Sequence, residues 1–558
     1  MADLRAVALG QQPADLLLTN ARVVNVFTGQ VEAGNVAIAG GRIVGVGGYT
    51  QAKAVIDLKG QYLAPAFIDG HVHVESSLLT PGQYGRAVVP HGTGAVITDL
   101  HEIANVAGSP GMRYVLDSAR RLPLDVFLMA PSCVPATNLE TSGAALDAAA
   151  LRPVLRWRSC VGLGEVMNYP GVLAGDPAVL AKLRLAGDRP IDGHAPGLRG
   201  GELDAYIAAG IQSDHESVTT EEGAEKLAKG MLLMIREGSS EKNLAALLPL
   251  VTEQTYPRCL LVVDDRTCVD LLDDGDIDAV VRKAVSLGLD PVRAIQLATI
   301  NPARYFRLPG LGAVAPGYRA NLAVLDDLRE MRVSMVFHEG RLVARDGQPL
   351  FEAPASRSSV LVESVKARPL TADALRLPDR GDPAPVIEII PGQIVTRRTD
   401  EPGNLPDATR DVLKAVVVER HHATGHVGVG LVRGFGLKSG ALASSVAHDS
   451  HNIVAVGVSD AAILTAVAEI VRVHGGLVAA ADDRVIASLP LPVAGLLSDE
   501  PLDRVVGQLR QVERAAAELG CRLPSPFATL SFLALPVIPE LRRTDLGLVD
   551  VTQFRLLQ

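Results

Sequence analysis

The chain has 558 residues, of which 48% are hydrophobic, and its 53 basic and 63 acidic side chains give a formal net charge of −10. This length exceeds the size at which single hydrophobic cores stop growing, so we expect two or three domains. The acidic balance, without any run of basic residues, argues against a nucleic-acid partner.

The cysteines and the apolar segments bear on the cellular location. Five cysteines are scattered without a Cys-x-x-Cys pair, which argues against a disulfide framework or a thiolate metal site. The N-terminal residues lack the pattern of a secretory signal, and no uninterrupted apolar stretch reaches membrane-spanning length. We therefore expect a cytoplasmic protein without a membrane partner.

Short β-rich runs separated by glycine turns fill residues 15–65. Similar short runs return at 312–326 and 333–343. The simplest interpretation is a small β-sandwich domain composed of residues 1–66 and 310–360, with the rest of the first half of the chain inserted into it.

The inserted segment, residues 67–309, has a different rhythm, because apolar strand-like runs recur in it at intervals of about 20–35 residues. Helical patterns fill most of the gaps, for example at 110–121, 144–157 and 221–230. Strand–helix units repeated in this way are typical of a (β/α)8 barrel, which is an α/β fold. The eight predicted strands are 67–72, 95–100, 125–131, 160–165, 190–195, 211–216, 231–237 and 259–265.

The second half of the chain begins with an acidic, proline-containing stretch that we interpret as a linker over residues 361–385. Beyond it, predicted strands at 386–390, 413–419 and 453–458 alternate with predicted helices at 461–473 and 502–518. Residues 386–558 are therefore expected to form a separate C-terminal α+β domain.

Polar residues stand at the ends of the predicted barrel strands, where barrels of this class carry their chemistry. His71 and His73 alternate along the first strand, so both side chains can point into one cavity. Together with similar residues at other strand ends they form a set whose nitrogen and oxygen atoms suit divalent metals. The candidate metal ligands are His71, His73, Glu165, His194, His215 and Asp264.

Six candidate ligands exceed what one catalytic ion commonly needs, so the set could hold two ions if a carboxylate bridges them. Glu165, at the end of the fourth strand, is the natural bridge. Two adjacent ions lower the pKa of a shared water, and Asp264 could both bind a metal and relay the proton of that water. A carbamylated lysine cannot replace Glu165, because no lysine stands between Lys59 and Lys182.

Other polar residues near the barrel mouth have two open interpretations. These residues are Glu75, His101, Glu102 and Glu237. They could line a substrate pocket, or they could cap helices and form hydrogen bonds with loops. In the C-terminal part, the cluster His-Asp-Ser-His-Asn at 448–452 could bind a metal, form a structural network or belong to a lid over the barrel.

The sequence resembles the amidohydrolase superfamily in Ala66-Phe67-Ile68-Asp69-Gly70-His71-Val72-His73, in the split β-domain and in the aspartate after the eighth strand. Within that superfamily it resembles the bacterial adenine deaminases over nearly its whole length. The segments that carry this likeness are HVHVESSLLTP (71–81), HEIANVAG (101–108), GLGEVMNYPGV (162–172), DGHAPGLRGGELDAYIAAGIQSDHE (192–216), REGSSEKNL (236–244), VDDR (263–266), GFGLKSGALASSVAHDSHNI (434–453), LPLPVAGLLSD (489–499) and PFATLSFLALPVIPELRRTDLGL (526–548).

The resemblance implies an enzyme of purine salvage that converts adenine and water to hypoxanthine and ammonia. It also implies two divalent ions per chain, manganese or iron with zinc as an alternative, and a homo-oligomer such as a dimer. Asp264 would relay the proton, and Glu216 or another nearby acid would protonate the ring.

The chain departs from the family pattern after Arg266. Thr267-Cys268 stands where His-Pro is expected, and residues 274–278 stand where Glu-Gly-His-Ile-Asp is expected. Two other hypotheses therefore remain: a hydrolase of a related amino- or alkylamino-purine or another heterocycle, and a non-catalytic barrel kept for assembly.

Overall fold

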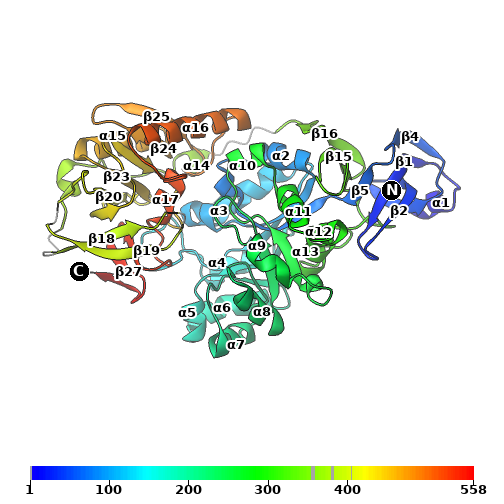
Figure 1. Cartoon of the computed structure of the whole chain (residues 1–558), viewed down its shortest axis with the longest axis horizontal. Coiled ribbons are helices and arrows are strands. Elements are labelled where there is room, and N and C mark those ends of the chain that lie inside the picture. Colours follow the sequence, from blue (N-terminus) through cyan, green and yellow to red (C-terminus); the bar gives the residue numbers. More distant parts are fainter. Residues whose placement is uncertain (1–2, 354–358, 379–382, 392, 404, 558) are drawn as a thin grey trace.

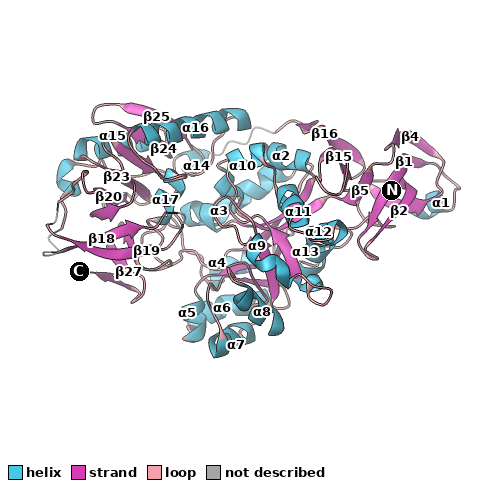
Figure 2. Ribbon diagram, in the orientation of Figure 1, coloured by secondary structure: helices cyan, strands magenta, loops and turns pink. Residues whose placement is uncertain are grey.

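The computed structural model describes residues 3–353, 359–378, 383–391, 393–403 and 405–557 (Figure 1). Parts of the predicted β-domain (354–358) and of the predicted linker (379–382) lie outside the described residues. Figure 2 shows three regions in a row: a sheet near the N-terminus, a central mixed region and a second large sheet with helices on both faces. No helix among the described residues has the length and apolar character needed to cross a bilayer.

The N-terminal region is one nine-stranded sheet built from two distant chain segments. The segments meet where β5 (Tyr62–Pro65) pairs antiparallel with β14 (Leu322–Leu325). Apolar residues from both segments pack in one core, so the insertion between them leaves and returns at adjacent strands. The other strands are β1 (Ala14–Asn25), β2 (Gln30–Ala39), β3 (Arg42–Gly47), β4 (Ala52–Asp57), β15 (Val333–His338), β16 (Arg341–Arg345) and β17 (Gln348–Pro349), and α1 is Leu4–Ala8.

The inserted segment is a (β/α)8-type barrel, as the sequence predicts. Five parallel strands form one sheet and three form another. Backbone hydrogen bonds join the two sheets on both sides, from Asp264 N to His71 O (3.0 Å) and from Gln212 N to Ile191 O (3.0 Å). The strands are β6 (Phe67–Val72), β7 (Thr93–Asp99), β8 (Asp125–Ala130), β9 (Cys160–Val166), β10 (Ile191–Gly193), β11 (Ser213–Asp214), β12 (Leu232–Arg236) and β13 (Cys259–Val262).

The barrel helices follow the strands, and most predicted helices occur in shortened or shifted form. The predicted helix at 110–121 corresponds to the second part of α3 (His101–Ala119), which consists of two helical segments that meet at a kink at Gly108, where φ is 59° and the backbone is not helical. The remaining helices are η1 (Val74–Ser77), α2 (Pro81–Val88), η2 (Val89–His91), α4 (Ala148–Val154), α5 (Tyr169–Leu173), α6 (Pro177–Ala186), α7 (Gly200–Ala208), α8 (Thr220–Ala228), α9 (Leu244–Leu247), η3 (Leu248–Leu250), η4 (Tyr256–Arg258), α10 (Cys268–Asp273), α11 (Ile277–Ser286), α12 (Pro291–Leu297) and α13 (Ile300–Tyr305).

The C-terminal half is built on an eight-stranded sheet covered on both faces. Alternate residues of β20 (Val412–Val418) divide between two cores, Val416 packing on the side of α15 and Leu413 on the side of α16. The further strands are β18 (Ala384–Ile389), β19 (Thr396–Glu401), β21 (Val427–Arg433), β22 (Ala441–Ser444), β23 (Ile453–Gly457), β24 (Gly476–Ala480) and β25 (Val485–Pro490). The helices are α15 (Asp460–Arg472), α16 (Leu502–Glu518) and α17 (Pro526–Phe532), and β26 (Leu541–Thr544), β27 (Gly547–Asp550) and β28 (Arg555–Leu557) form a small third sheet.

The described part of the predicted linker is anchored to its neighbours. Leu361 of α14 (Ser359–Val362) is buried among barrel residues, and Leu375 of η5 (Ala372–Leu375) is buried in the core under α15. This stretch therefore packs against both halves of the molecule.

Candidate metal centre

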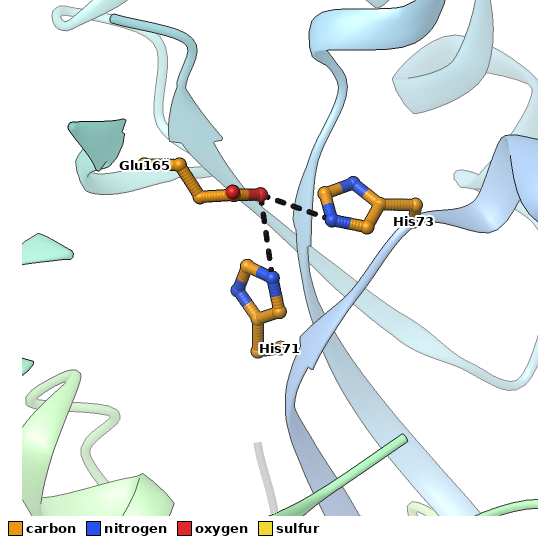
Figure 3. Close-up of side chains that lie close together, drawn as sticks. All are labelled: His71, His73 and Glu165. Atoms are coloured by element: carbon orange, nitrogen blue, oxygen red, sulfur yellow. Dashed lines mark ion pairs between the residues drawn. The ribbon is translucent and has the colours of Figure 1, made fainter. Parts of the chain in front are cut away.

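His71 and His73 stand at the carboxyl end of β6, and their rings meet edge to face with centroids 5.0 Å apart. Figure 3 shows both rings directed at the carboxylate of Glu165, which comes from the end of β9. All three side chains are buried. The alternation along the strand thus brings the two imidazoles to the same carboxylate.

The Glu165 carboxylate lies at the centre of four imidazoles. Its Oε1 is 3.0 Å from His73 Nε2 and 3.4 Å from His71 Nε2. Its Oε2 is 2.9 Å from His194 Nδ1 and 3.6 Å from His215 Nε2. Each oxygen therefore faces a different pair of histidines, which is the arrangement of a carboxylate able to bridge two cations.

Asp264 joins this group from the loop after β13. Its Oδ1 lies 3.2 Å from His73 Nε2 and 3.5 Å from His71 Nε2. Its backbone has φ of 62°, a left-handed conformation that is costly for a residue other than glycine. Hydrogen bonds between its backbone and those of His71 and His73 hold it there.

The chemistry of these donors fits divalent cations. The ligand atoms of His71, His73 and Glu165 lie within 4.8 Å of one another, as do those of Glu165, His194 and His215. Among the described residues, His71 Nε2 and Glu165 Oε1 are buried without a hydrogen-bond partner. Buried polar atoms are normally paired, so these two atoms are available to bind a cation, for which nitrogen and carboxylate oxygen donors are suited.

The electrostatics of the centre also favour cations. Burial disfavours charge on His71, but the nearby carboxylates of Asp264 and Glu165 outweigh it and raise the pKa of His71 to about 10. Burial would raise the pKa of Glu165, yet the nearby imidazole of His73 holds that pKa well below its usual range. Burial and the nearby His71 keep the pKa of His215 well below normal, so His215 is a neutral donor.

Neighbouring groups fix the orientation of the ligands. Asp99 accepts a hydrogen bond from Glu165 N through Oδ2 (2.9 Å), and its carbonyl oxygen lies 3.0 Å from His73 Nδ1. His194 N donates to the Tyr206 hydroxyl (3.0 Å), which in turn donates to Val166 O (2.8 Å). Such partners set the tautomer and direction of metal-binding histidines.

Glu216 lies beside the centre, and a residue that sequence reasoning missed holds it there. Arg236, at the end of β12, forms a two-pronged ion pair with Glu216 and places Nη1 2.8 Å from Asp264 Oδ2. A guanidinium is neither a metal ligand nor a general acid, so Arg236 does not stand out among the polar residues at the strand ends. Its position at the end of a predicted strand, next to Glu237, could have identified Arg236 in the sequence.

The other candidates divide between the centre and its surroundings. His101 Nδ1 lies 3.8 Å from Glu165 Oε1, at the edge of the centre. Glu75 Oε1 accepts a hydrogen bond from Ile103 N (3.1 Å) and so caps α3, while the Glu102 carboxylate is paired with His448 and His451 of the C-terminal half. The structure does not bring Glu237 to the centre.

The contacts of Glu237 lie between α9 and α11. Its carboxylate pairs with Lys283 and accepts a hydrogen bond from Leu244 N (3.1 Å). Strand geometry explains this placement, because Arg236 and Glu237 are consecutive and point to opposite sides.

The comparisons with known proteins confirm both resemblances seen in the sequence. The amidohydrolase family matches residues 62–343, and the adenine deaminase C-terminal domain matches residues 392–555. A protein named adenine deaminase from Dehalococcoides mccartyi is 58% identical, with 100% of this chain and 99% of the relative covered. Adenine deaminase 2 from Carboxydothermus hydrogenoformans is 50% identical, with 99% and 98% covered.

The barrel and its ligand-rich centre thus define an amidohydrolase. Because the full-length relatives at 47–58% identity carry one name, the chain belongs to the adenine deaminase family of amidohydrolases.

Proposed function

We propose that this protein is a metal-dependent hydrolase that converts adenine and water to hypoxanthine and ammonia. The observation that carries the proposal is the full-length identity of 58% with a relative named adenine deaminase. The geometry agrees with it, because five buried candidate ligands and the half-buried His194 come together at the carboxyl end of the barrel. A non-catalytic barrel would have no need to keep that set intact.

The residues that would hold two divalent ions are His71, His73, Glu165, His194, His215 and Asp264. Manganese or iron is proposed, with zinc as the alternative, because each accepts nitrogen and carboxylate donors. Bound there, the ions would lower the pKa of a water molecule and make it nucleophilic near neutral pH. Glu165 is proposed as the bridge because its two oxygens face different histidine pairs.

Asp264 is proposed to move the proton. Its Oδ1 faces the ligand histidines, and its Oδ2 is paired with Arg236. It would accept a proton from the attacking water and deliver it to the amino group that leaves C6 as ammonia. The imidazoles of His71 and His73, and then the guanidinium of Arg236, hold the pKa of Asp264 well below its usual range and so keep the carboxylate ionised.

Glu216 is proposed to act on the purine ring. It lies 3.7 Å from His194 Nδ1 and 3.5 Å from His215 Nε2, and Arg236 fixes both of its oxygens. The ionised carboxylate can only accept a hydrogen bond, so Glu216 would first take up a proton from solvent and then donate it to a ring nitrogen, which would make C6 more electrophilic.

The stretch that departs from the family pattern favours one alternative, a related amino- or alkylamino-purine as the preferred substrate. Thr267 caps α10, accepting a hydrogen bond from Asp270 N (3.3 Å), and it lines a cavity at the barrel mouth. A different residue at this position therefore changes the lining of the cavity in which a substrate would lie.

We propose a cytoplasmic location from the state of the cysteines. All five cysteines are free and buried, which suits a reducing cytoplasm. A role in purine salvage and assembly as a homodimer are proposed from the family; size measurement in solution tests the dimer.

The test is product analysis with protein purified in manganese. Adenine should yield equal amounts of hypoxanthine and ammonia, faster than 6-methylaminopurine or 2,6-diaminopurine. If either analogue were turned over faster than adenine, that analogue and not adenine would be the preferred substrate. No turnover of any purine by protein that contains its metals would refute the proposed function.

A further inference from the structure

A cavity lies between the mouth of the barrel and the C-terminal half of the chain. On the barrel side its lining includes Glu75, Ser76, Glu102, Asp265 and Arg266. These residues follow the centre residues His73, His101 and Asp264 by one to three positions. The cavity therefore opens beside the metal centre.

The opposite wall comes from the C-terminal half, chiefly from α17, which lies near α3 in Figure 1. Phe527, Ser531 and Phe532 of α17 line the cavity, together with His448. Among the described lining residues, the two phenylalanine rings and both histidine rings all belong to this half. The barrel contributes carboxylates, hydroxyls and a guanidinium, but no ring.

His448 is held in place from three directions. Its ring stacks on Phe532 with centroids 4.7 Å apart and an interplanar angle of 19°. Its Nδ1 pairs with one oxygen of Glu102, whose other oxygen pairs with His451. Its backbone N–H donates to Ser531 Oγ (3.2 Å). A wall fixed in this way is preorganised for a flat ligand.

A purine is a flat aromatic ring with a polar edge, and it needs both an aromatic or apolar surface and hydrogen-bonding groups. Stacking of a base on an aromatic side chain is worth about 1–3 kcal/mol. The barrel side of the cavity offers polar groups near the centre, while the C-terminal side offers rings. All of the rings come from the C-terminal half, and the polar groups nearest the centre come from the barrel, so a purine held at the centre would contact both halves.

We propose that the C-terminal domain forms one wall of the purine pocket, and that Phe532 and His448 provide the surface on which the base packs. The proposal rests on the proposed function, since it assigns a binding surface for the same substrate. It gives the C-terminal domain a direct part in substrate recognition.

The experiment compares steady-state kinetics of four metal-loaded variants with the wild type. Phe532→Ala should raise KM for adenine about tenfold to hundredfold, as the loss of one base-stacking ring does, and Phe532→Tyr should retain most of the affinity. His448→Ala should also raise KM. Phe554→Ala is the matched control, because Phe554 is 50% exposed and not among the lining residues; its kinetics should be unchanged. Metal content should be equal in all.

The outcomes separate this inference from the proposed function. If the wild type deaminates adenine but Phe532→Ala and His448→Ala keep its KM, the composite pocket is wrong and the deaminase stands. If both variants bind less metal and have a lower kcat while KM is unchanged, the role of Phe532 and His448 is structural and the inference fails. If Phe532→Ala does not fold, Phe532→Leu is measured in its place, because leucine keeps the volume without the aromatic face. A raised KM for adenine then supports the inference, and an unchanged KM refutes it. If the wild type leaves adenine unchanged, the proposed function itself fails.

Discussion

Lys226 on α8 provides a test of how the barrel holds its metal ligands. Its ammonium group is fully buried and donates three hydrogen bonds of 2.8 Å, to Ala195 O, Asp214 Oδ2 and Glu222 Oε1. Asp214 in turn accepts a hydrogen bond from Ala195 N (3.0 Å). This network ties together the loops after β10 and β11, which carry His194 and His215.

The substitution Lys226→Met keeps the approximate length of the side chain and removes its charge. Two buried carboxylates, on Asp214 and Glu222, then lack their cation, and breaking a buried pair in this way costs about 3–5 kcal/mol. Loss of groups that orient ligands weakens metal binding by about 10- to 100-fold. We therefore expect a local loss of stability together with weaker metal binding.

Hydrogen exchange of peptides covering residues 191–228 is the suitable assay, because a multidomain chain does not unfold in a single step. Protection there should fall by about hundredfold or more, which corresponds to about 3 kcal/mol. Lys229→Met is the matched control: Lys229 pairs with Asp204 and Glu225 at the surface and should change little. Protection and metal affinity both within threefold of wild type in Lys226→Met would refute this reasoning.

Three further predictions concern the centre itself. Asp264→Asn should lower kcat by about 10²- to 10⁴-fold; near-normal turnover with metal present, measured by elemental analysis beside the assay, would rule out the proton relay. Arg236→Met should lower kcat/KM at least about tenfold. Glu216→Gln should lower kcat/KM less in the Arg236→Met variant than in the wild type, because the two side chains act as a unit; equal effects in both backgrounds would contradict their coupling. Acidification from about pH 7 to about pH 5 should release metal, since protons compete for the imidazole nitrogens, and a metal content that does not change over this range would argue against histidine ligands.

The barrel was predictable because its signals are local and repeated. Apolar runs at regular spacing indicate parallel strands, and His71 and His73 follow from strand alternation alone. The part of α3 before its kink at Gly108 was missed, because Gly108 and Pro110 suggest the start of a helix and not a kink between two helical segments. β11 is only two residues long, since Asp214 turns its side chain back to bond Ser217 N.

Contacts between distant segments were not predictable in this way. The pairing of Glu102 with His448 joins positions 346 residues apart, and no periodicity in the sequence announces it. The approach of Arg236 to both Glu216 and Asp264 depends on the order of strands around the barrel and on side-chain length. The roles of the six candidate ligands stay predictions, although the structure brings them all together.

The most direct test of the account is a manganese titration of metal-free protein with adenine as substrate, following ammonia release. Activity should rise from a negligible level and reach a plateau at about two ions per chain, and Glu165→Ala should bind the ions poorly and stay inactive. Full activity without metal, or a Glu165→Ala variant that matches the wild type, would contradict a deaminase built around the Glu165 bridge.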